Sequence, residues 1–335
     1  TSIYQRRMIL MTALRKTTLS LFIIGFCNTH SSIAGTMGPI KTGCSGNRLF
    51  AGADALYLQP RNDDLDYTTY LVDNYTKTLN THLDYDWGFR LYGGVKFANN
   101  NDITIAWQRL HTRDNDMLLG NGDIAIEPRW LNLAAWASVQ SENIFDYDEV
   151  SGVFAHTHDF NNAWLIRYGA GAEYAEIDSR LTVNGIEQTI QGHTNISNFQ
   201  GFGPRIEADV FYNFYREFNV FASANSALLI GSRDVSLLAH HPFGVSRDFS
   251  DRNTIVPKLG LRIGLDYQRP FGLIGDGAAS TIDFQVGWQA ETYIDAIERP
   301  STGLVGGEGV VVLPQRSNYS NQGLFFGMKL TSGCL

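Results

Sequence analysis

Apolar and polar residues alternate along long stretches of the chain. From Leu83 to Phe97, every second position is apolar, aromatic or glycine, and the positions between them are mostly charged or glycine. Successive side chains of a β-strand point to opposite faces of a sheet. The stretch therefore predicts a strand with one apolar and one polar face. Similar alternation recurs in 164–175, 202–210, 257–268, 282–289 and 323–330.

A soluble β-sandwich also has alternating strands, but three features favour a membrane barrel. The alternating segments run for about 12 to 16 residues, whereas soluble strands average about five or six. Charged residues lie mid-strand on the polar face, as a lumen requires. Trp164 and Tyr174 lie on one face, separated by roughly 25 Å of membrane normal, the height of the apolar band between aromatic girdles. We therefore predict an all-β fold, a closed antiparallel transmembrane β-barrel, because unpaired strand edges cannot be satisfied in lipid.

The connections between the segments alternate between long and short, as expected for short periplasmic turns and long extracellular loops. Ten strands are predicted at 47–59, 82–97, 101–113, 144–157, 162–177, 198–213, 217–232, 254–268, 281–296 and 321–331. The long connections are 60–81, 114–143, 178–197, 233–253 and 297–320. The stretch 124–140 is apolar enough to supply an extra hairpin, so twelve strands is the alternative.

The N-terminal segment has the pattern of a cleaved signal peptide. Arg15 and Lys16 precede a short apolar stretch that ends at Cys27, and Ser32-Ile33-Ala34 comes before Gly35. These are a charged region, an apolar region and a small-x-small cleavage site. We predict that residues 1–34 are removed and that residues 35–335 form a single domain in the outer membrane of a Gram-negative bacterium.

Charge and hydropathy agree with this assignment. Charged residues make up 18% of the chain, and the mean hydropathy of −0.15 is far below that of a helical membrane protein. Removal of residues 1–34 takes away four of the 26 Lys and Arg and none of the 34 Asp and Glu, so the net charge goes from −8 to −12. An acidic chain argues against a nucleic-acid partner, and it hints at a preference for cations.

The polar faces of the strands supply candidate pore-lining residues. We expect ion pairs inside the barrel, for example between Arg90 and Asp84 or Asp86, which lie about 6.6 Å apart along one face. The candidates are Asp84, Asp86, Arg90, Lys96, Arg167, Glu173, Arg205, Glu207, Asp209, Lys258, Arg262, Asp266 and Lys329.

Other motifs give no catalytic, cofactor or metal assignment. Gly201 to Arg205 and Gly169-Ala170-Gly171 do not complete a nucleotide-binding glycine motif and precede no helical pattern. His156 and His158 share a strand face, but a zinc site needs three or four ligands. Asp84 and Asp86 could serve acid–base chemistry, but ion pairing is the simpler role. We expect no enzyme, cofactor or metal, with an outer-membrane hydrolase as the remote alternative.

Several segments resemble the Legionella-type major outer membrane protein family of pore-forming barrels. The resemblance rests on 52–57, 83–90, 201–205 and 228–231, and would extend over about residues 44–335. It implies an outer-membrane channel, and it leaves homo-oligomers and disulfide-linked chains open. The C-terminus departs from the usual barrel ending, because Thr331-Ser332-Gly333-Cys334-Leu335 follows the last strand.

The expected function is passive diffusion of small hydrophilic solutes through a polar lumen rich in glycine. The small number of strands argues against a wide pore. The interior of an eight-stranded barrel is just filled by side chains, and open porins have 16 or more strands. The alternative is a non-conducting barrel, structural or adhesive, whose loops bind a partner. Membrane lipid is a partner in either case.

Cys44 and Cys334 flank the first and last strands. These strands pair at the seam of a barrel with an even strand number, so the two cysteines should meet at the periplasmic rim, where a disulfide can form. We predict an intramolecular bridge. Bonds between chains, which the family resemblance makes credible, are the alternative.

Overall fold

The computed structural model describes residues 46–333, except 63, 73–74, 120–124, 129–137, 161–162, 187–189, 241–245, 272–279 and 306–308. The predicted signal peptide and both Cys44 and Cys334 lie outside the described residues. The strands are β1 (Arg48–Asn62), β2 (Asp66–Val72), β3 (Tyr75–Asn80), β4 (Asp86–Lys96), β5 (Asn101–Leu119), β6 (Ala125–Pro128), β7 (Ser138–Phe160), β8 (Trp164–Ile186), β9 (Ile190–Tyr215), β10 (Phe218–His240), β11 (Ser246–Phe271), β12 (Ser280–Val305) and β13 (Gly309–Thr331).

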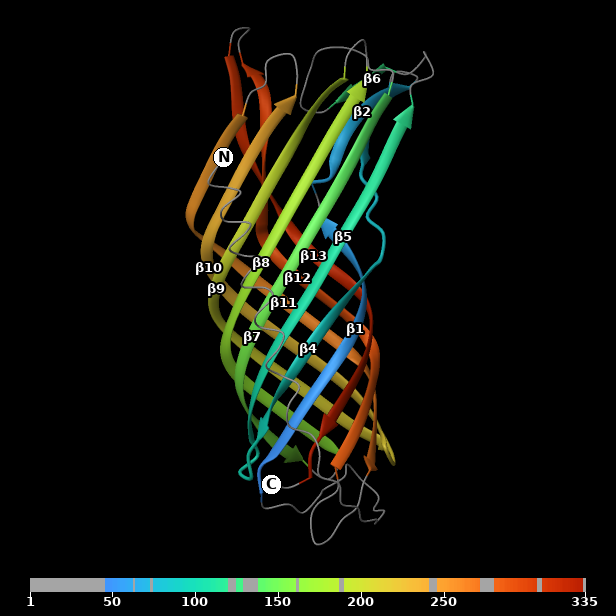
Figure 1. The fold of residues 1–335 in the computed structure, drawn as a ribbon, viewed down its shortest axis with the longest axis vertical. Coiled ribbons are helices and arrows are strands. Elements are labelled where there is room, and N and C mark those ends of the chain that lie inside the picture. The colour runs from blue at the N-terminus through green and yellow to red at the C-terminus, as the bar shows by residue number, and fades with distance from the viewer. Residues whose placement is uncertain are drawn as a thin grey trace, which may run out of the picture.

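Ten strands form one closed antiparallel ring, in the order β1-β13-β12-β11-β10-β9-β8-β7-β5-β4 (Figure 1). The predicted fold and strand number are therefore confirmed. The seam between the first and last strands runs from Phe50↔Thr331 to Asn62↔Tyr319. The start of β1 and the end of β13 share the end of the barrel that carries the short β4–β5 and β9–β10 turns. By the rule for bacterial barrels this is the periplasmic end, and the opposite end is extracellular.

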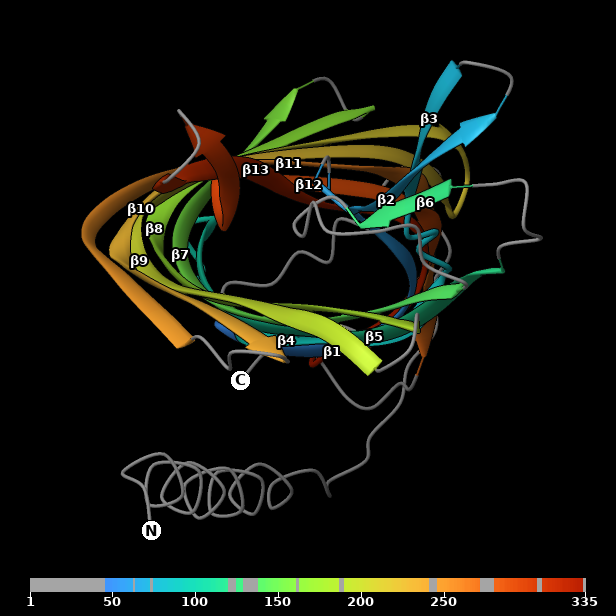
Figure 2. The ribbon, with the colours of Figure 1, turned by 90° about the horizontal axis from the view of Figure 1, so that it is seen from above.

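A separate three-stranded sheet, in the order β3-β2-β6, lies at the extracellular rim beside the ring (Figure 2). The stretch 124–140 contributes β6 to this sheet and the start of β7 to the ring. Its described residues add no hairpin to the wall, and the ring has ten strands rather than the alternative twelve.

The strands continue further on the extracellular side than the sequence pattern indicates. β9, β11 and β12 each have 26 residues. Much of the expected loops 178–197, 233–253 and 297–320 is therefore strand. Beyond the lipid the outward positions become polar, as with Arg180 and Asp234. The alternation of apolar and polar residues therefore ends there, although the strands continue.

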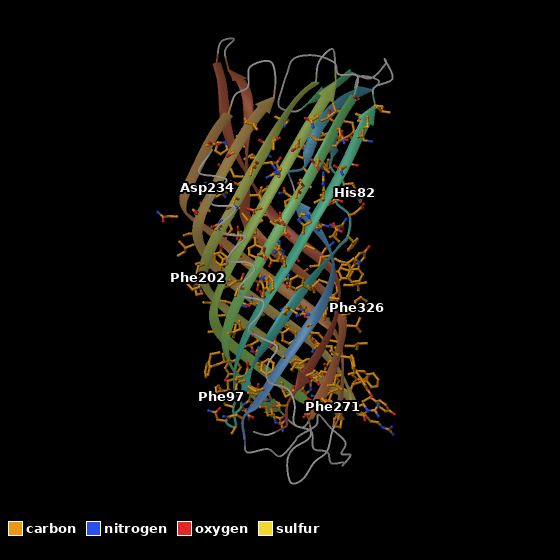
Figure 3. All side chains as sticks on the ribbon, viewed as in Figure 1. His82, Phe97, Phe202, Asp234, Phe271 and Phe326 are labelled. Atoms are coloured by element: carbon orange, nitrogen blue, oxygen red, sulfur yellow. The ribbon has the colours of Figure 1, made fainter. Side chains whose placement is uncertain are left out.

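The outer face of the ring is apolar. Exposed aromatic residues gather near the periplasmic end, where the rings of Trp164 and Tyr212 pack with their centroids 4.6 Å apart. A second aromatic group includes Trp87, which is 63% exposed and contacts Tyr57. Phe202 and Phe326 lie between the two levels and Phe271 near the lower end (Figure 3). This is the expected arrangement of a lipid-facing band. No helix in the described part of the chain is long and apolar enough to cross a membrane.

The inward-facing glycines allow neighbouring strands to approach each other closely. They contribute less to open space in the lumen than expected from the sequence. A Cβ on Gly171 would lie 1.9 Å from the carbonyl oxygen of Gly152 on the neighbouring strand β7, and one on Gly203 would lie equally close to the carbonyl oxygen of Leu228 on β10. Only glycine fits such a contact without movement of the backbone, and strand glycines commonly mark such close approaches.

The ring is closed only in its periplasmic part. β12 pairs with β11 from Ser280 up to Tyr293, and β5 pairs with β4 only as far as Arg109. Nearer the extracellular end, β5, β7, β8, β9, β10 and β11 continue as one curved sheet. The extracellular ends of β12 and β13 pair with each other there.

Candidate pore interior

The inward positions of the periplasmic half surround a polar chamber with a volume of about 300 Å³. Its lining extends from Lys96 and Thr331 near the periplasmic turns to Glu149 and Glu291 deep in the barrel. Nine of the thirteen candidate pore-lining residues lie in its wall: Arg90, Lys96, Arg167, Arg205, Glu207, Asp209, Arg262, Asp266 and Lys329.

The deep end of the chamber is occupied by five charged residues, Lys258, Arg205, Glu149, Glu173 and Glu291, which we call the central charge cluster. Lys258 Nζ lies 2.6 Å from Glu149, 3.3 Å from Glu291 and 3.4 Å from Glu173. Arg205 Nη1 lies 2.7 Å from Glu149 and 2.6 Å from Glu173. Three carboxylates thus share two cations, which leaves a negative excess near the barrel axis.

Neutral donors complete the hydrogen bonding of these carboxylates. The Tyr147 hydroxyl donates to Glu149 Oε2 at 2.7 Å, and the Tyr293 hydroxyl donates to Glu173 Oε1 at 3.1 Å. Gln108 donates to Glu291 at 2.9 Å. Buried charges are tolerated when they are paired and their remaining lone pairs are satisfied. The cluster can therefore persist inside a narrow barrel.

A second network lines the chamber closer to the periplasm. Arg167 donates to Asp102 at 2.7 Å and to Asp209 at 2.7 Å, and it also pairs with Glu207. Lys329 lies 3.3 Å from Asp283. Lys96 lines the same chamber, and no ion pair of its side chain is found in the described part of the chain.

The expected ion pair of Arg90 with Asp84 or Asp86 is not formed. Arg90 Nη1 instead lies 3.4 Å from Asp54 on β1, which Arg262 also contacts at 2.7 Å. Asp84 precedes β4 and its side chain is 79% exposed, 3.3 Å from His82. The strand begins only at Asp86, so the alternation that predicted an inward Asp84 does not hold at that point.

Sequence reasoning missed several residues of the interior. Glu291 continues the polar face of β12 by the same two-residue period that identified Glu173, so the period could have found it. Glu149 gave no such signal, because the inward face of β7 also carries Phe145, Tyr147 and Val153. Asp54 lies between Ala53 and Ala55 and is 2% exposed. Tyr147 and Tyr293 carried no such signal, because aromatic residues in a barrel are expected on the lipid face.

Above the central charge cluster the interior is filled by aromatic and aliphatic side chains. Tyr319 packs on Tyr147 and Phe145, with ring centroids 5.6 Å apart in both pairs. Phe199 and Leu58 are fully buried in the same cluster. In this structure the polar chamber therefore ends at a packed layer in the middle of the barrel.

The histidine pair lies on the outer face near the periplasmic end. His156 Nδ1 is 2.7 Å from Asn101 Oδ1, and the His158 ring contacts Phe160 with a centroid distance of 4.4 Å. Among the described residues, no group of three or more His, Cys, Asp or Glu side chains is placed to hold a metal ion.

Comparison with known proteins identifies the family. The family model described as Legionella pneumophila major outer membrane protein precursor matches residues 41–332. The chain belongs to this family. Membership confirms the resemblance seen in the sequence and places the barrel in the outer membrane. No curated protein sequence matches the chain significantly.

Among solved structures, the similar ones are other barrels at low identity. The outer membrane protease OmpT from Escherichia coli is 8% identical, with 85% of this chain and 96% of that chain covered and a TM-score of 0.42. The translocator domain of the autotransporter NalP from Neisseria meningitidis is 11% identical, with 97% and 95% covered and a TM-score of 0.34. Likeness at this level supports no inference about activity, so function rests on the interior of this barrel.

Proposed function

We propose that this family member forms a narrow outer-membrane pore for small hydrophilic solutes, with a preference for cations. The observation that carries the proposal is the polar chamber that leads from the periplasmic end to the central charge cluster. Charged side chains on both sides of the chamber keep it hydrated. The expected preference for cations rests on the central charge cluster, where three carboxylates face two cations, although the rest of the chamber wall carries both signs of charge.

The packed layer above the central charge cluster closes the passage through the barrel. This layer consists of side chains of the strands themselves, and the described residues include no separate plug domain. Rotamer changes at Tyr147 and Tyr293 would widen the passage beside the central charge cluster. We expect a pore that is closed most of the time and opens in brief steps.

The packed layer at Phe145, Phe199 and Tyr319 favours a second function, a non-conducting structural or adhesive barrel. Conductance of the purified protein in planar bilayers separates the two. For the pore we expect discrete current steps, a reversal potential that favours K⁺ over Cl⁻, and a weaker preference in Glu173→Gln.

The matched variants for this measurement are Tyr147→Ala with Tyr293→Ala inside the barrel, and Tyr168→Ala on the lipid face, where Tyr168 is 54% exposed. The first pair should enlarge the current steps and the outer control should not. A silent membrane from the wild type and from the widened variant would support the non-conducting barrel.

The proposal includes no catalytic step. Single replacement of His156, His158, Asp84 or Asp86 by Ala should remove no hydrolytic activity. A protease or lipase activity that disappears in one of these four variants would instead establish the hydrolase alternative.

A further inference from the structure

The extracellular ends of β12 and β13 form a two-stranded hairpin, residues 297–305 and 309–317, which we call the inner hairpin. Its strands pair with each other from Ile297↔Ser317 to Val305↔Gly309. On the β12 side, pairing with β11 stops at Tyr293, and on the β13 side, pairing with β1 stops at Tyr319. Within the described residues, no ladder of hydrogen bonds joins either outer edge of the inner hairpin to the ring.

An irregularity in β12 marks the point where the inner hairpin leaves the wall. The register with β13 shifts between Tyr293 and Ile297, so three residues of β12 stand opposite Asn318. Asp295 has a φ of 56°, and its N–H donates to Asn318 Oδ1 at 3.0 Å. Extra residues of this kind bend a strand and re-aim it. Residues 294–296 therefore have the geometry of a hinge.

Beyond this point the inner hairpin reaches across the interior to other strands. The N–H of Glu298 donates to Ser197 Oγ on β9 at 3.1 Å, and Arg299 donates to Ser179 Oγ on β8 at 3.1 Å. Glu298 also pairs with Arg233 of β10 at 2.6 Å. Because these strands belong to the curved extracellular sheet, the inner hairpin lies against the concave face of that sheet.

The described contacts between the inner hairpin and the curved sheet are mostly polar. Besides the two serine contacts and the ion pair, Arg233 donates to the Asp295 carbonyl oxygen at 2.7 Å, and Ala296 and Ile297 are fully buried in the packed cluster. Its release would break these contacts while the ring ladders remain intact. Hinge motions of packed elements typically occur over microseconds to milliseconds.

We propose that the inner hairpin is a lid over the extracellular mouth of the pore, hinged at 294–296 and latched by Glu298 and Arg299. Closed, it completes the packed layer above the central charge cluster. Open, it exposes the concave face of the extracellular sheet and the outer side of the packed layer, so that rotation of Tyr147 and Tyr293 can then join the polar chamber to the outside. This inference rests on the proposed pore, so its test needs one readout that does not depend on conductance.

The first readout is thiol labelling of Val256→Cys, with Cys44 and Cys334 replaced by Ser. Val256 is fully buried and belongs to the same cluster as Ile297. We expect a membrane-impermeant maleimide to label it about tenfold faster when Glu298→Gln and Arg299→Met are added. Asp84→Cys, at an exposed position, should react equally fast with and without the latch changes. Slow, unchanged labelling of Val256→Cys in the unlatched variant would mean a fixed hairpin and would overturn the proposal.

The second readout locks the lid in the folded protein. Ser197→Cys with Glu298→Cys, in the same cysteine-free background, can form a disulfide where the backbone of residue 298 meets the side chain of residue 197. We expect current steps after reduction and silence after oxidation, with the cysteine-free parent insensitive to both treatments. Equal conductance in the reduced and oxidised states would overturn the lid. Silence in both states, together with faster labelling of the unlatched variant, would leave the lid standing and reject the pore.

Discussion

The two halves of the barrel solve the problem of strand edges differently. In the periplasmic half every strand of the ring has two neighbours and the interior is a polar chamber. In the extracellular half the wall is a curved sheet of β5, β7, β8, β9, β10 and β11, and packed side chains and the inner hairpin fill its concave face. Lipid forbids unpaired edges and water tolerates them. The ring is therefore complete where the apolar band surrounds it, and further out the structure can be built like a soluble sheet with a core.

Truncation of one aromatic residue in each half gives the largest expected contrast. Phe199→Ala removes a fully buried ring from the packed half and should lower the free energy of unfolding by about 3–5 kcal/mol. Phe50→Ala removes a partly exposed ring from the chamber wall and should cost about 1 kcal/mol. Urea unfolding followed by tryptophan fluorescence measures both. Equal costs would mean that the two interiors are packed alike.

Removal of the shared cation tests the boundary between the halves. Lys258→Met leaves Glu149, Glu173 and Glu291 with only Arg205 as a cationic partner, and should destabilise the barrel by about 3 kcal/mol. Added Glu149→Gln should restore part of the loss in a double-mutant cycle. Lys96→Met is the control, since that lysine lies in open chamber space, and should change the unfolding free energy by less than about 0.5 kcal/mol.

A charge change in the chamber should alter ion flow with little effect on stability. If the proposed pore conducts, Lys96→Glu adds negative charge near the periplasmic end and should shift the reversal potential further toward K⁺. The equivalent exchange on the extracellular outer face, Arg113→Glu, should leave the potential unchanged. A shift of equal size in both variants would contradict a selective chamber.

The smallest effect concerns Asp114, which lies beyond the lipid band in the extracellular half. Burial raises its pKa, and Asp84, Asp86 and Asp116 raise it further, against the backbone N–H of Asp84, which lowers it. The charged form is thus disfavoured in the folded state, and this penalty is felt once the pH exceeds the pKa of the unfolded chain.

Asp114→Asn should therefore raise the Tm at pH 7 by no more than about 2 °C, and the gain should vanish as the pH falls to about 4. Asp234→Asn, at an exposed position, is the control and should change the Tm at neither pH. A larger gain at pH 4 than at pH 7 would contradict the sign of this shift.

The sequence could predict the ring but not the course of the extracellular half. Alternation identified all ten ring strands, because lipid outside and polar side chains inside impose a period of two. The same rule placed Arg167, Glu207 and Lys329 on the inward face. It could not predict that Arg90 pairs with Asp54, because partners across strands depend on register. It also could not predict the inner hairpin, whose direction depends on an irregularity at Asp295 and on Ser179 and Ser197 of other strands.

The seam between β1 and β13 has a consequence for how the molecule is made. The described part of the chain brings Leu49 and Ser332 together in two hydrogen bonds, of 2.9 Å and 2.8 Å, across a sequence separation of 283 residues. Contacts so distant along the chain form late, because the loop between them must first be ordered. Until translation and export are finished, β1 has a free edge and the barrel cannot close. Every incomplete chain is thus a template for aberrant pairing, so we expect C-terminally truncated chains to accumulate as aggregates or to be degraded in the periplasm.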